Sequence, residues 1–310
     1  INAIADINAA VAVLQWDQEV YMPPKGAGPR GMQLATLSAL SHREFTSPET
    51  GTLLAECEAA RDTLSHADER LVAIARYDFE RAQRLPERFV HAFAKECSAA
   101  YEAWTKARQE SKFSLFQPNL ERLIELSRQR AEYLGYTGSP YNALLEDYER
   151  GMTAEQLKVI FADLADRQSR LVERILQSPH QPDTAWLNGT WDTQAQWDFG
   201  MRVLRDLGYD LEAGRQDRSV HPFSTIFAID DVRITTRLSS EEPFSSLTGT
   251  IHECGHALYM QGHDPEDGRT MLADGASLGM HESQSRMWEN VIGRSLPFWK
   301  HYTPTLREHF

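Results

Sequence analysis

Apolar residues recur every three or four positions over most of the first two thirds of the chain. This spacing places them on one face of an α-helix, which has 3.6 residues per turn. The pattern predicts helices that pack this face into a hydrophobic core. The clearest stripes are Phe89, Phe93, Cys97, Tyr101 and Trp104; Leu120, Leu123, Ile124, Ala131 and Leu134; Leu157, Ile160, Phe161, Leu164, Leu171, Val172 and Ile175; and Trp197, Val203, Leu204 and Leu207.

Local signals mark where several of these helices start and stop. Pro86 precedes the first stripe, and proline is favoured where a helix begins. Thr153 and Gln156 form a capping-box pattern, in which two side chains satisfy free backbone N–H groups of the first turn. Gly135 and Gly208 follow the second and fourth stripes, where a glycine commonly ends a helix.

The pattern changes near residue 220. Residues 224–229 and 232–237 are rich in β-branched and aromatic side chains, and Asp230 and Asp231 lie between them as a turn. These residues predict a short antiparallel hairpin. Helical signals return from Pro243 onward. We therefore expect a mainly α, multi-helix fold with a small antiparallel β-sheet.

No internal repeat, low-complexity tract or glycine- and serine-rich linker divides the 310 residues. The simplest interpretation is a single domain over residues 1–310, mostly helical over 1–215, with the hairpin and further helices over 216–310. Residues 178–189 contain two prolines and a glycine and are expected to form a surface loop. A chain of this length can bury a large core without disulfides.

Charge and cysteine content narrow the class of protein. The 32 basic and 45 acidic residues give a net charge of −13, and the scattered basic residues argue against a nucleic-acid partner. Cys57, Cys97 and Cys254 have neither disulfide nor metal-ligand spacing. No apolar run approaches the roughly 20 residues that span a bilayer, and no signal peptide is evident. We expect a cytoplasmic protein, and the absence of an initiator Met indicates a processed product or a fragment.

The segment Ile251-His-Glu-Cys-Gly-His-Ala-Leu258 contains the pattern H-E-x-x-H. His252 and His256 lie four positions apart, so both imidazoles project from one helix face and can reach a single metal ion. Glu253 lies beside them, where it can act as general base on a metal-activated water. The alternative is a surface helix with two solvated histidines. The apolar flanks argue against it, because two buried histidines without a metal would be costly to satisfy.

A catalytic zinc site usually needs a third protein ligand and one open position. Glu282 lies 30 residues after His252 (282 − 252), which leaves room for a loop and a second helix beside the first. His252, His256 and Glu282 would give the two-histidine, one-glutamate set of thermolysin-like zinc enzymes. His263 is the alternative third ligand and requires a longer loop. We expect one Zn²⁺ per chain, which another divalent ion such as Co²⁺ could replace.

Further motifs show a resemblance to a known family, the H-E-x-x-H zinc carboxypeptidases typified by carboxypeptidase Taq. The resemblance spans essentially the whole chain and keeps the family's order of motifs. It rests on Trp16-Asp17-Gln18, Met22-Pro23, Gly26, Arg30, Gln33, His221-Pro222-Phe223, Asp231-Val-Arg233-Ile-Thr235, His252 to His256 and His281-Glu282-Ser283-Gln284.

The resemblance implies a mainly helical homodimer that removes C-terminal residues from peptides with broad specificity. It also assigns His252, His256 and Glu282 to the metal and Glu253 to catalysis. Family members continue beyond the position of Phe310 with I-R-x-x-A-D and G-x-x-Q-D-x-x-W motifs, which this chain lacks. The chain therefore resembles a truncated member. We expect the missing part to leave a large apolar face exposed, which favours aggregation or tight self-association.

Five residues are candidates for lining the cleft or supporting the ligands. Glu289 lies two helical turns beyond the predicted glutamate ligand and could hold a ligand imidazole. His281, about 100° around the helix from that ligand, is a candidate oxyanion donor. Asp231 and Arg233 either orient a ligand or line the cleft, or else form a structural ion pair. His221 either faces the cleft or is an ordinary turn residue.

These observations favour a zinc metallocarboxypeptidase acting on peptides, without a nucleic-acid or membrane partner. Such an enzyme needs a cation for the terminal carboxylate of its substrate, and none of Arg233, Arg237 and Arg286 is compelling. One alternative is an oligopeptidase or endopeptidase with the same zinc site and no carboxylate anchor. Another is a catalytically idle, zinc-binding helical fragment. A peptide amidated at its C-terminus separates the first two, because only the oligopeptidase would cut it.

Overall fold

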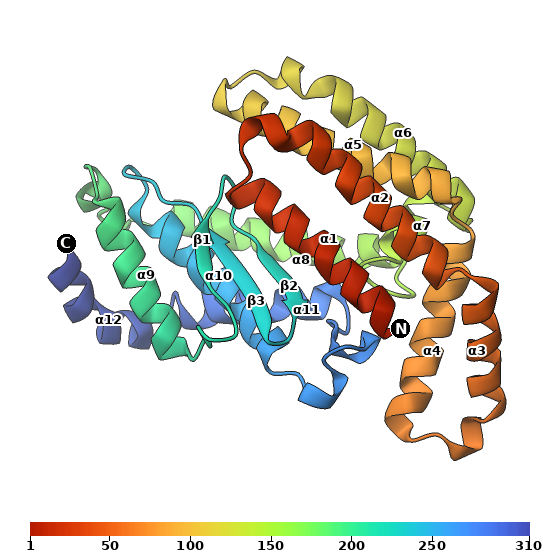
Figure 1. Cartoon of the computed structure of the whole chain (residues 1–310). Coiled ribbons are helices and arrows are strands. Elements are labelled where there is room, and N and C mark those ends of the chain that lie inside the picture. The colour runs from red at the N-terminus through yellow and green to blue at the C-terminus, as the bar shows by residue number, and fades with distance from the viewer.

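The computed structural model describes residues 1–310, and twelve α-helices dominate it (Figure 1). A π-helical segment, Met287–Ile292, directly continues the eleventh helix. The expectation of a mainly α protein is confirmed. The helices are α1 (Asn2–Val20), α2 (Ala27–Phe45), α3 (Pro48–Ala59), α4 (His66–Gln83), α5 (Glu87–Gln109), α6 (Gln117–Leu134), α7 (Pro140–Leu145), α8 (Ala154–Leu176), α9 (Thr193–Leu207), α10 (Pro243–Gln261), α11 (Leu278–Arg286) and α12 (Leu296–His309).

The local signals mark the helix ends correctly. α5 begins directly after Pro86. Thr153 and Gln156 form both hydrogen bonds of a capping box at the start of α8. α6 and α9 end at Gly135 and Gly208, whose φ angles of +72° and +90° are accessible because glycine has no Cβ.

One small sheet lies between α1 and α10, with strand order β1-β3-β2 (Figure 1). Its strands are β1 (Gln216–Arg218), β2 (Ser224–Ala228) and β3 (Asp231–Thr236). β2 and β3 form the predicted antiparallel hairpin. β1 pairs with β3 in parallel, with Gln216 opposite Ile234, so the sheet is mixed and not antiparallel throughout. Three residues are too short a strand to produce a recognisable alternation of polar and apolar positions.

The hydrophobic core is built around α10. On one side, Cys254, Ala257 and Met260 pack against Val232 and Ile234 of β3. The other side carries a second cluster that joins α10 to α9 and α12. Because both sides of α10 are packed, the helix is held in a fixed rotation about its axis, which fixes where its polar side chains point. The second cluster is Phe199, Val203, Leu247, Ile251, Phe298 and Tyr302.

The N-terminal helices form a second layer next to the sheet. α2 packs against α1 and α5, and α6 packs against α5, as Figure 1 shows. Gln18 of α1 donates hydrogen bonds to the Ser98 carbonyl and to the Glu102 carboxylate of α5. The predicted stripes are buried in part here, at Phe89 of α5 and at Ala131 and Leu134 of α6. This layer meets the sheet through α1, which packs on β2.

α8 departs from the expectation that every apolar stripe packs into a core. The helix and its stripe are present, but no residue of α8 is buried. Leu157 is partly buried, and the other six side chains of the stripe remain between 44% (Leu164) and 54% (Phe161 and Ile175) exposed. The pattern correctly predicts an amphipathic helix, but residues 1–310 supply no surface that covers its apolar face.

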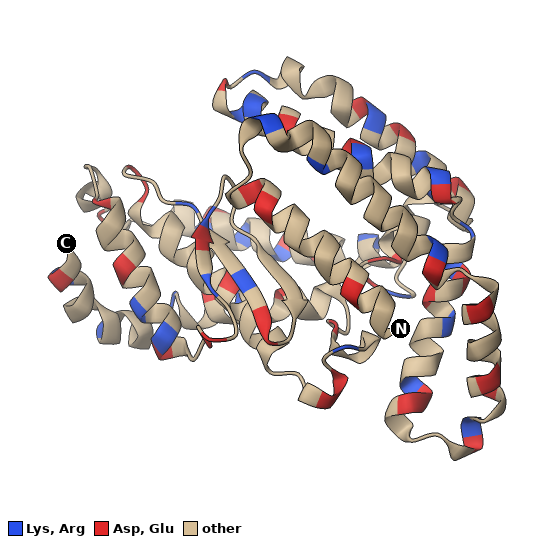
Figure 2. Cartoon of the chain, viewed as in Figure 1, with Lys and Arg blue, Asp and Glu red and all other residues tan.

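Acidic and basic residues lie mixed along the helices. In Figure 2, Lys and Arg lie interspersed with Asp and Glu along the helices and do not gather into a stripe. None of the helices combines the length and the apolar composition that a bilayer crossing requires.

Candidate metal centre

Three side chains from two helices converge on one point. The Nε2 atoms of His252 and His256, both on α10, lie 3.5 and 3.2 Å from Oε2 of Glu282 on α11. One potential ligand atom of each residue lies within 4.8 Å of the others. Two imidazole nitrogens and one carboxylate oxygen fit a zinc ion that keeps an open coordination position. His263, the alternative ligand, instead contacts the Met260 carbonyl at the end of α10.

Close contact between α10 and α11 brings the glutamate to the histidines. Gly255 of α10 faces the backbone of α11 without a side chain between them. Directly beyond it, Ser285 is fully buried and donates hydrogen bonds to the backbone carbonyl and to Oε2 of Glu282. Burial alone would raise the pKa of the Glu282 carboxyl, but this hydrogen bond and the nearby His252 lower it below its ordinary value. The Glu282 carboxylate is therefore charged and held in a fixed orientation, as a metal ligand needs to be.

Glu289 orients the ring of His252 through a hydrogen bond. Its Oε2 lies 2.9 Å from Nδ1 of His252, which leaves Nε2 of the same ring free for a metal. Glu289 is buried in the π-helical segment, and Arg294 and Arg286 donate hydrogen bonds to it over 2.7 and 3.3 Å. Burial raises the pKa of Glu289, but its hydrogen bonds with His252 and Arg294 outweigh burial and lower it. The carboxylate is thus charged and fixes the tautomer of His252.

His256 has the properties of a neutral ligand. Burial, together with the neighbouring His281 and His252, lowers its pKa to about 4. Metal ions bind the neutral imidazole, so this shift favours coordination. Nδ1 of His256 is buried and has no hydrogen-bond partner, while Nε2 faces Glu282. The Nε2 atom of this ring is therefore directed at the point where the three residues converge.

Glu253 lies in the position expected of a catalytic base. It follows His252 on α10, and only 6% of its surface is exposed. Burial raises its pKa to about 8, and the charges of Glu282 and Glu289 act in the same direction. A hydrogen bond with Ser224 of β2 opposes this rise. A carboxyl whose pKa lies near neutrality can both accept and return a proton.

The whole chain matches the sequence model of the family described as Carboxypeptidase Taq (M32) metallopeptidase, over residues 1–310. The chain belongs to this M32 family. Carboxypeptidase 1 of Bacillus subtilis is 37% identical over 308 residues, which are 99% of this chain and 62% of that protein. Thermostable carboxypeptidase 1 of Thermus thermophilus is 41% identical over 96% of this chain and 61% of that protein.

Solved structures agree with the family assignment. The crystal structure of BsuCP superposes with a TM-score of 0.98 at 37% identity, and covers 99% of this chain and 62% of its own. The M32 carboxypeptidase of Deinococcus radiodurans gives 0.88 at 40% identity over 100% of this chain and 62% of its own. The chain thus spans about three fifths of the length of these relatives.

Of the remaining candidates in this M32 chain, two histidines lie near the metal centre. His281 stacks on His256, with ring centroids 4.4 Å apart and planes 23° apart, so its ring packs against one face of the His256 imidazole. His221 has its pKa lowered by burial and by the positive charges of Arg108 and Arg237, and His252 adds to this effect. His221 therefore lies within electrostatic range of the site.

Asp231 and Arg233 pair with one another. The Arg233 guanidinium donates two hydrogen bonds to the Asp231 carboxylate, over 2.7 and 2.8 Å. The same guanidinium lies 4.7 Å from the ring centroid of Trp16 and 4.8 Å from that of Phe227. The two residues thus form an ion pair, and the contact of Arg233 with Trp16 ties β3 to α1.

The sequence did not single out Ser224 or Arg294. Ser224 contacts Glu253 because successive residues of a strand point to opposite faces, and this one points to α10. Arg294 reaches Glu289 from the turn before α12. The available signals were the position of Ser224 next to His221-Pro222-Phe223, and the closeness of Arg294 to a predicted helix of the site.

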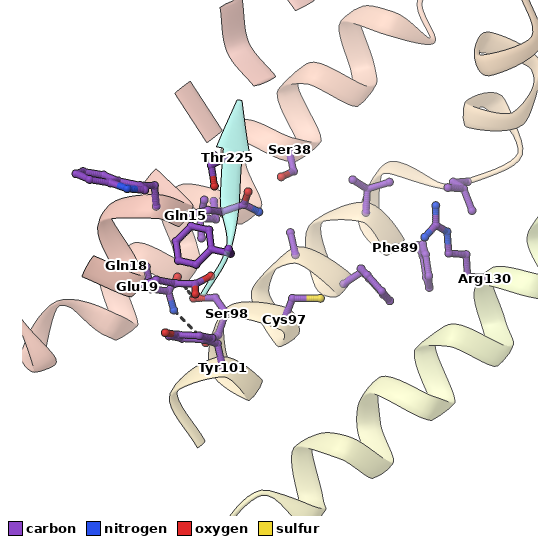
Figure 3. A pocket seen from close by; sticks show the side chains of 17 residues that line it. Gln15, Gln18, Glu19, Ser38, Phe89, Cys97, Ser98, Tyr101, Arg130 and Thr225 are labelled. Atoms are coloured by element: carbon purple, nitrogen blue, oxygen red, sulfur yellow. Dashed lines mark hydrogen bonds between the residues drawn. The ribbon is translucent and has the colours of Figure 1, made fainter. Parts of the chain in front are cut away.

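A separate pocket of about 590 Å³ lies on the opposite side of β2 from Glu253. Phe223 and Thr225, the neighbours of Ser224, line it together with residues of α1, α2 and α5. In Figure 3, Glu19 and Tyr101 lie near each other at one end, and Arg130 lies at the other. Burial raises the pKa of Glu19 to about 7, although a hydrogen bond with Tyr101 opposes the rise.

Proposed function

We propose that this chain carries the metal centre of a zinc metallocarboxypeptidase, which removes C-terminal residues from peptides. The convergence of His252, His256 and Glu282 beside the buried Glu253 is the observation that carries the proposal. Membership of the M32 family supports it, as do relatives named as carboxypeptidases. The proposal carries over an activity named for relatives of whose length this chain spans about three fifths.

Each residue of the centre has a role that follows from its contacts. His252 and His256 would hold zinc through Nε2, and Glu282 through its carboxylate. When bound, zinc polarises the scissile carbonyl and lowers the pKa of water at the open position. Glu253 accepts a proton from the attacking water and delivers it to the leaving amine. Ser224 orients the Glu253 carboxylate for both transfers.

Recognition of a C-terminal residue requires a cation for its carboxylate. Two of the three candidate arginines are already engaged, Arg233 with Asp231 and Arg286 with Glu282. Arg237 has only a looser pairing, 3.8 Å from Glu242, and it contributes to the positive field at His221. Among these three, Arg237 is the best placed to meet a substrate carboxylate.

The proposal includes a homodimer in the cytoplasm, with peptides as the substrates. The dimer follows from the family resemblance. All three cysteines, Cys57, Cys97 and Cys254, are free thiols, as expected of a reducing compartment.

The test is the turnover of one peptide in two forms, with a free and with an amidated C-terminus. Wild type should contain one zinc per chain by elemental analysis and should cleave only the free acid. Glu253→Gln should keep zinc and lose turnover, whereas Glu282→Gln should lose both. Equal cleavage of the amidated peptide would identify an oligopeptidase. Wild type that is folded and contains zinc but cleaves neither peptide would be the catalytically idle fragment.

A further inference from the structure

The helix that carries Glu282 has little apolar surface to hold it in place. Of the nine residues of α11, only Ser285 is buried. Leu278 and Met280, its large apolar side chains, are 50% and 47% exposed. Helices in proteins obtain most of their stability from the packing of an apolar face. Because α11 has no such buried face, other contacts have to fix its position beside α10.

The N-terminus of α11 supplies these contacts. The first backbone N–H groups of a helix have no partner inside the helix. In α11 the side chain of Ser277 accepts one of them. The next two are satisfied by residues 130 positions earlier in the chain: Leu278 N–H donates to the Tyr148 carbonyl over 2.9 Å, and Gly279 N–H donates to Oε2 of Glu149 over 3.1 Å. Two consecutive residues of a distant turn therefore cap this helix.

Glu149 directs its carboxylate at the start of α11. Its side chain forms no ion pair, and the bond from Gly279 is its only hydrogen bond. Gly279 makes this approach possible, because a Cβ atom on it would lie 2.6 Å from Oε2 of Glu149. A carboxylate also stabilises a helix N-terminus, which carries a partial positive charge. Glu282 follows Leu278 by about one helical turn (282 − 278 = 4), so a shift of the capped end would move its carboxylate.

The turn that bears Glu149 follows α7 and is itself held firmly by other helices. Asp147 accepts a hydrogen bond from Arg81 of α4 over 2.8 Å and lies 3.0 Å from Arg130 of α6. Arg150 pairs with Asp78 of α4. These ion pairs flank Glu149 on both sides in sequence. The position of its carboxylate is therefore fixed relative to α4 and α6.

The segment that leads into α11 rests on the same helix. The 3₁₀ turn Met271–Ala273 contacts α4, and Met271 packs against Ala75 and Phe79 on that helix. Both the approach to α11 and the turn that caps it are thus attached to α4. Together with the contact between Gly255 and Ser285, these attachments define where α11 lies.

We propose that Glu149 is a positioning residue for the metal centre. By capping α11, it holds Glu282 at the distance from His252 and His256 that a shared metal ion requires. Glu149 acts through the helix and does not touch the metal. This inference rests on the proposed function, because it assigns Glu149 a role only if the three residues bind a metal.

Two variants of Glu149 and one matched control separate positioning from general stability. Glu149→Ala removes the acceptor, whereas Glu149→Gln keeps a side-chain oxygen that can accept the same hydrogen bond. The control is Asp192→Ala. Asp192 caps α9 by accepting the Ala195 N–H over 2.7 Å, and α9 carries no proposed ligand. Glu149→Ala and the control should each lower the Tm by about 2–4 °C, because each removes a helix cap.

The deciding measurement is the zinc affinity of each chain, determined by competition with a chelator. Wild type and Asp192→Ala should bind zinc equally tightly. Glu149→Ala should bind it about ten-fold more weakly, the lower end of the cost of losing a residue that orients a metal ligand. Glu149→Gln should recover most of the affinity.

The possible failures can be told apart. Wild type that binds no zinc would contradict the proposed metal centre and, with it, the role of Glu149. If wild type binds zinc and Glu149→Ala binds it equally tightly, the metal centre stands and only the positioning role is wrong. An equal loss of affinity in Asp192→Ala would also overturn the positioning role, because the effect would then follow from lower stability alone.

Discussion

Gly255 and Ser285 are in contact across the metal centre, on α10 and α11. A Cβ atom placed on Gly255 would lie 2.6 Å from Cα of Ser285 and 2.9 Å from the carbonyl oxygen of Gln284. Both neighbours are backbone atoms, which cannot move aside as a flexible side chain can. The absence of a side chain on Gly255 therefore lets α11 approach α10 closely, and this approach brings Glu282 to the two histidines.

Gly255→Ala should push α11 away from α10 and weaken metal binding. Gly249→Ala on the same helix is the control, because its Cβ would be 3.4 Å from the ring of Pro222, an ordinary contact. Alanine in a helix interior is favoured over glycine by up to about 1 kcal/mol, so the control should be slightly stabilised. Unfolding and zinc titrations on both variants would measure this. Equal zinc affinities would show that α11 does not depend on this contact.

Glu289→Gln should weaken zinc binding by about 10–100-fold, the usual cost of losing a residue that orients a metal ligand. The amide would keep a hydrogen bond to His252 but remove the charge that Arg294 and Arg286 hold in place. Glu241→Gln, an exposed change next to α10, should leave the affinity unaltered. Competition with a chelator of known affinity would measure both. If the Glu289 variant bound zinc as tightly as wild type, Glu289 would contribute to packing and not to zinc binding.

The sequence predicted the three converging residues better than it predicted the residues around them. A four-residue spacing on a helix decides that His252 and His256 share a face, and this holds whatever packs around them. Glu289 was a candidate, but its role depends on a π-helical segment and on Arg294, which no periodic pattern describes. Resemblance to the family pointed to Asp231 and Arg233, but only the fold shows that they bind each other across two residues of a strand.

The apolar stripes show the same limit on a larger scale. The stripe on α9 and the one on α8 have the same periodicity, and the first buries Val203 and Leu204 completely while the second buries nothing. Periodicity records that a helix has an apolar face. Whether a partner surface lies within the same 310 residues is a property of the tertiary arrangement, which local sequence does not contain.

Removing the metal should destabilise the wild-type protein. A ligand at 1,000 times its Kd that binds only the folded state adds about 4 kcal/mol to the free energy of unfolding. Adding a chelator should therefore lower the Tm of zinc-loaded wild type by several degrees and leave Glu282→Gln nearly unchanged. Differential scanning calorimetry with and without the chelator would show this. An equal drop in both proteins would mean that the chelator acts elsewhere.

Stability should also depend on pH through Glu19. Its pKa is about 7 in the folded chain, against an ordinary value of 4.5, so the folded state binds more protons between these pH values. The free energy of unfolding therefore falls as the pH rises through this window, and the loss is complete above pH 7. Glu19→Gln should have a Tm a few degrees above wild type at pH 8 and equal to it near pH 4.

The matched control for Glu19 is Glu56→Gln, an exposed glutamate on α3. It should change the Tm little at either pH. If Glu19→Gln also raised the Tm near pH 4 by the same amount, the gain would come from packing in the pocket and not from the charge.

The absence of buried residues in α8 also predicts how fast its backbone amide hydrogens exchange with solvent. Amide hydrogens exchange through the local unfolding event of lowest free energy. A helix with no buried residue can unwind without disturbing any other element. Exchange along α8 should therefore be fast and independent of the metal, while the amides of α10 should exchange only when both core clusters come apart. The same chain would thus contain its most protected helix, α10, which carries His252 and His256, and its least protected helix, α8, whose apolar face is exposed.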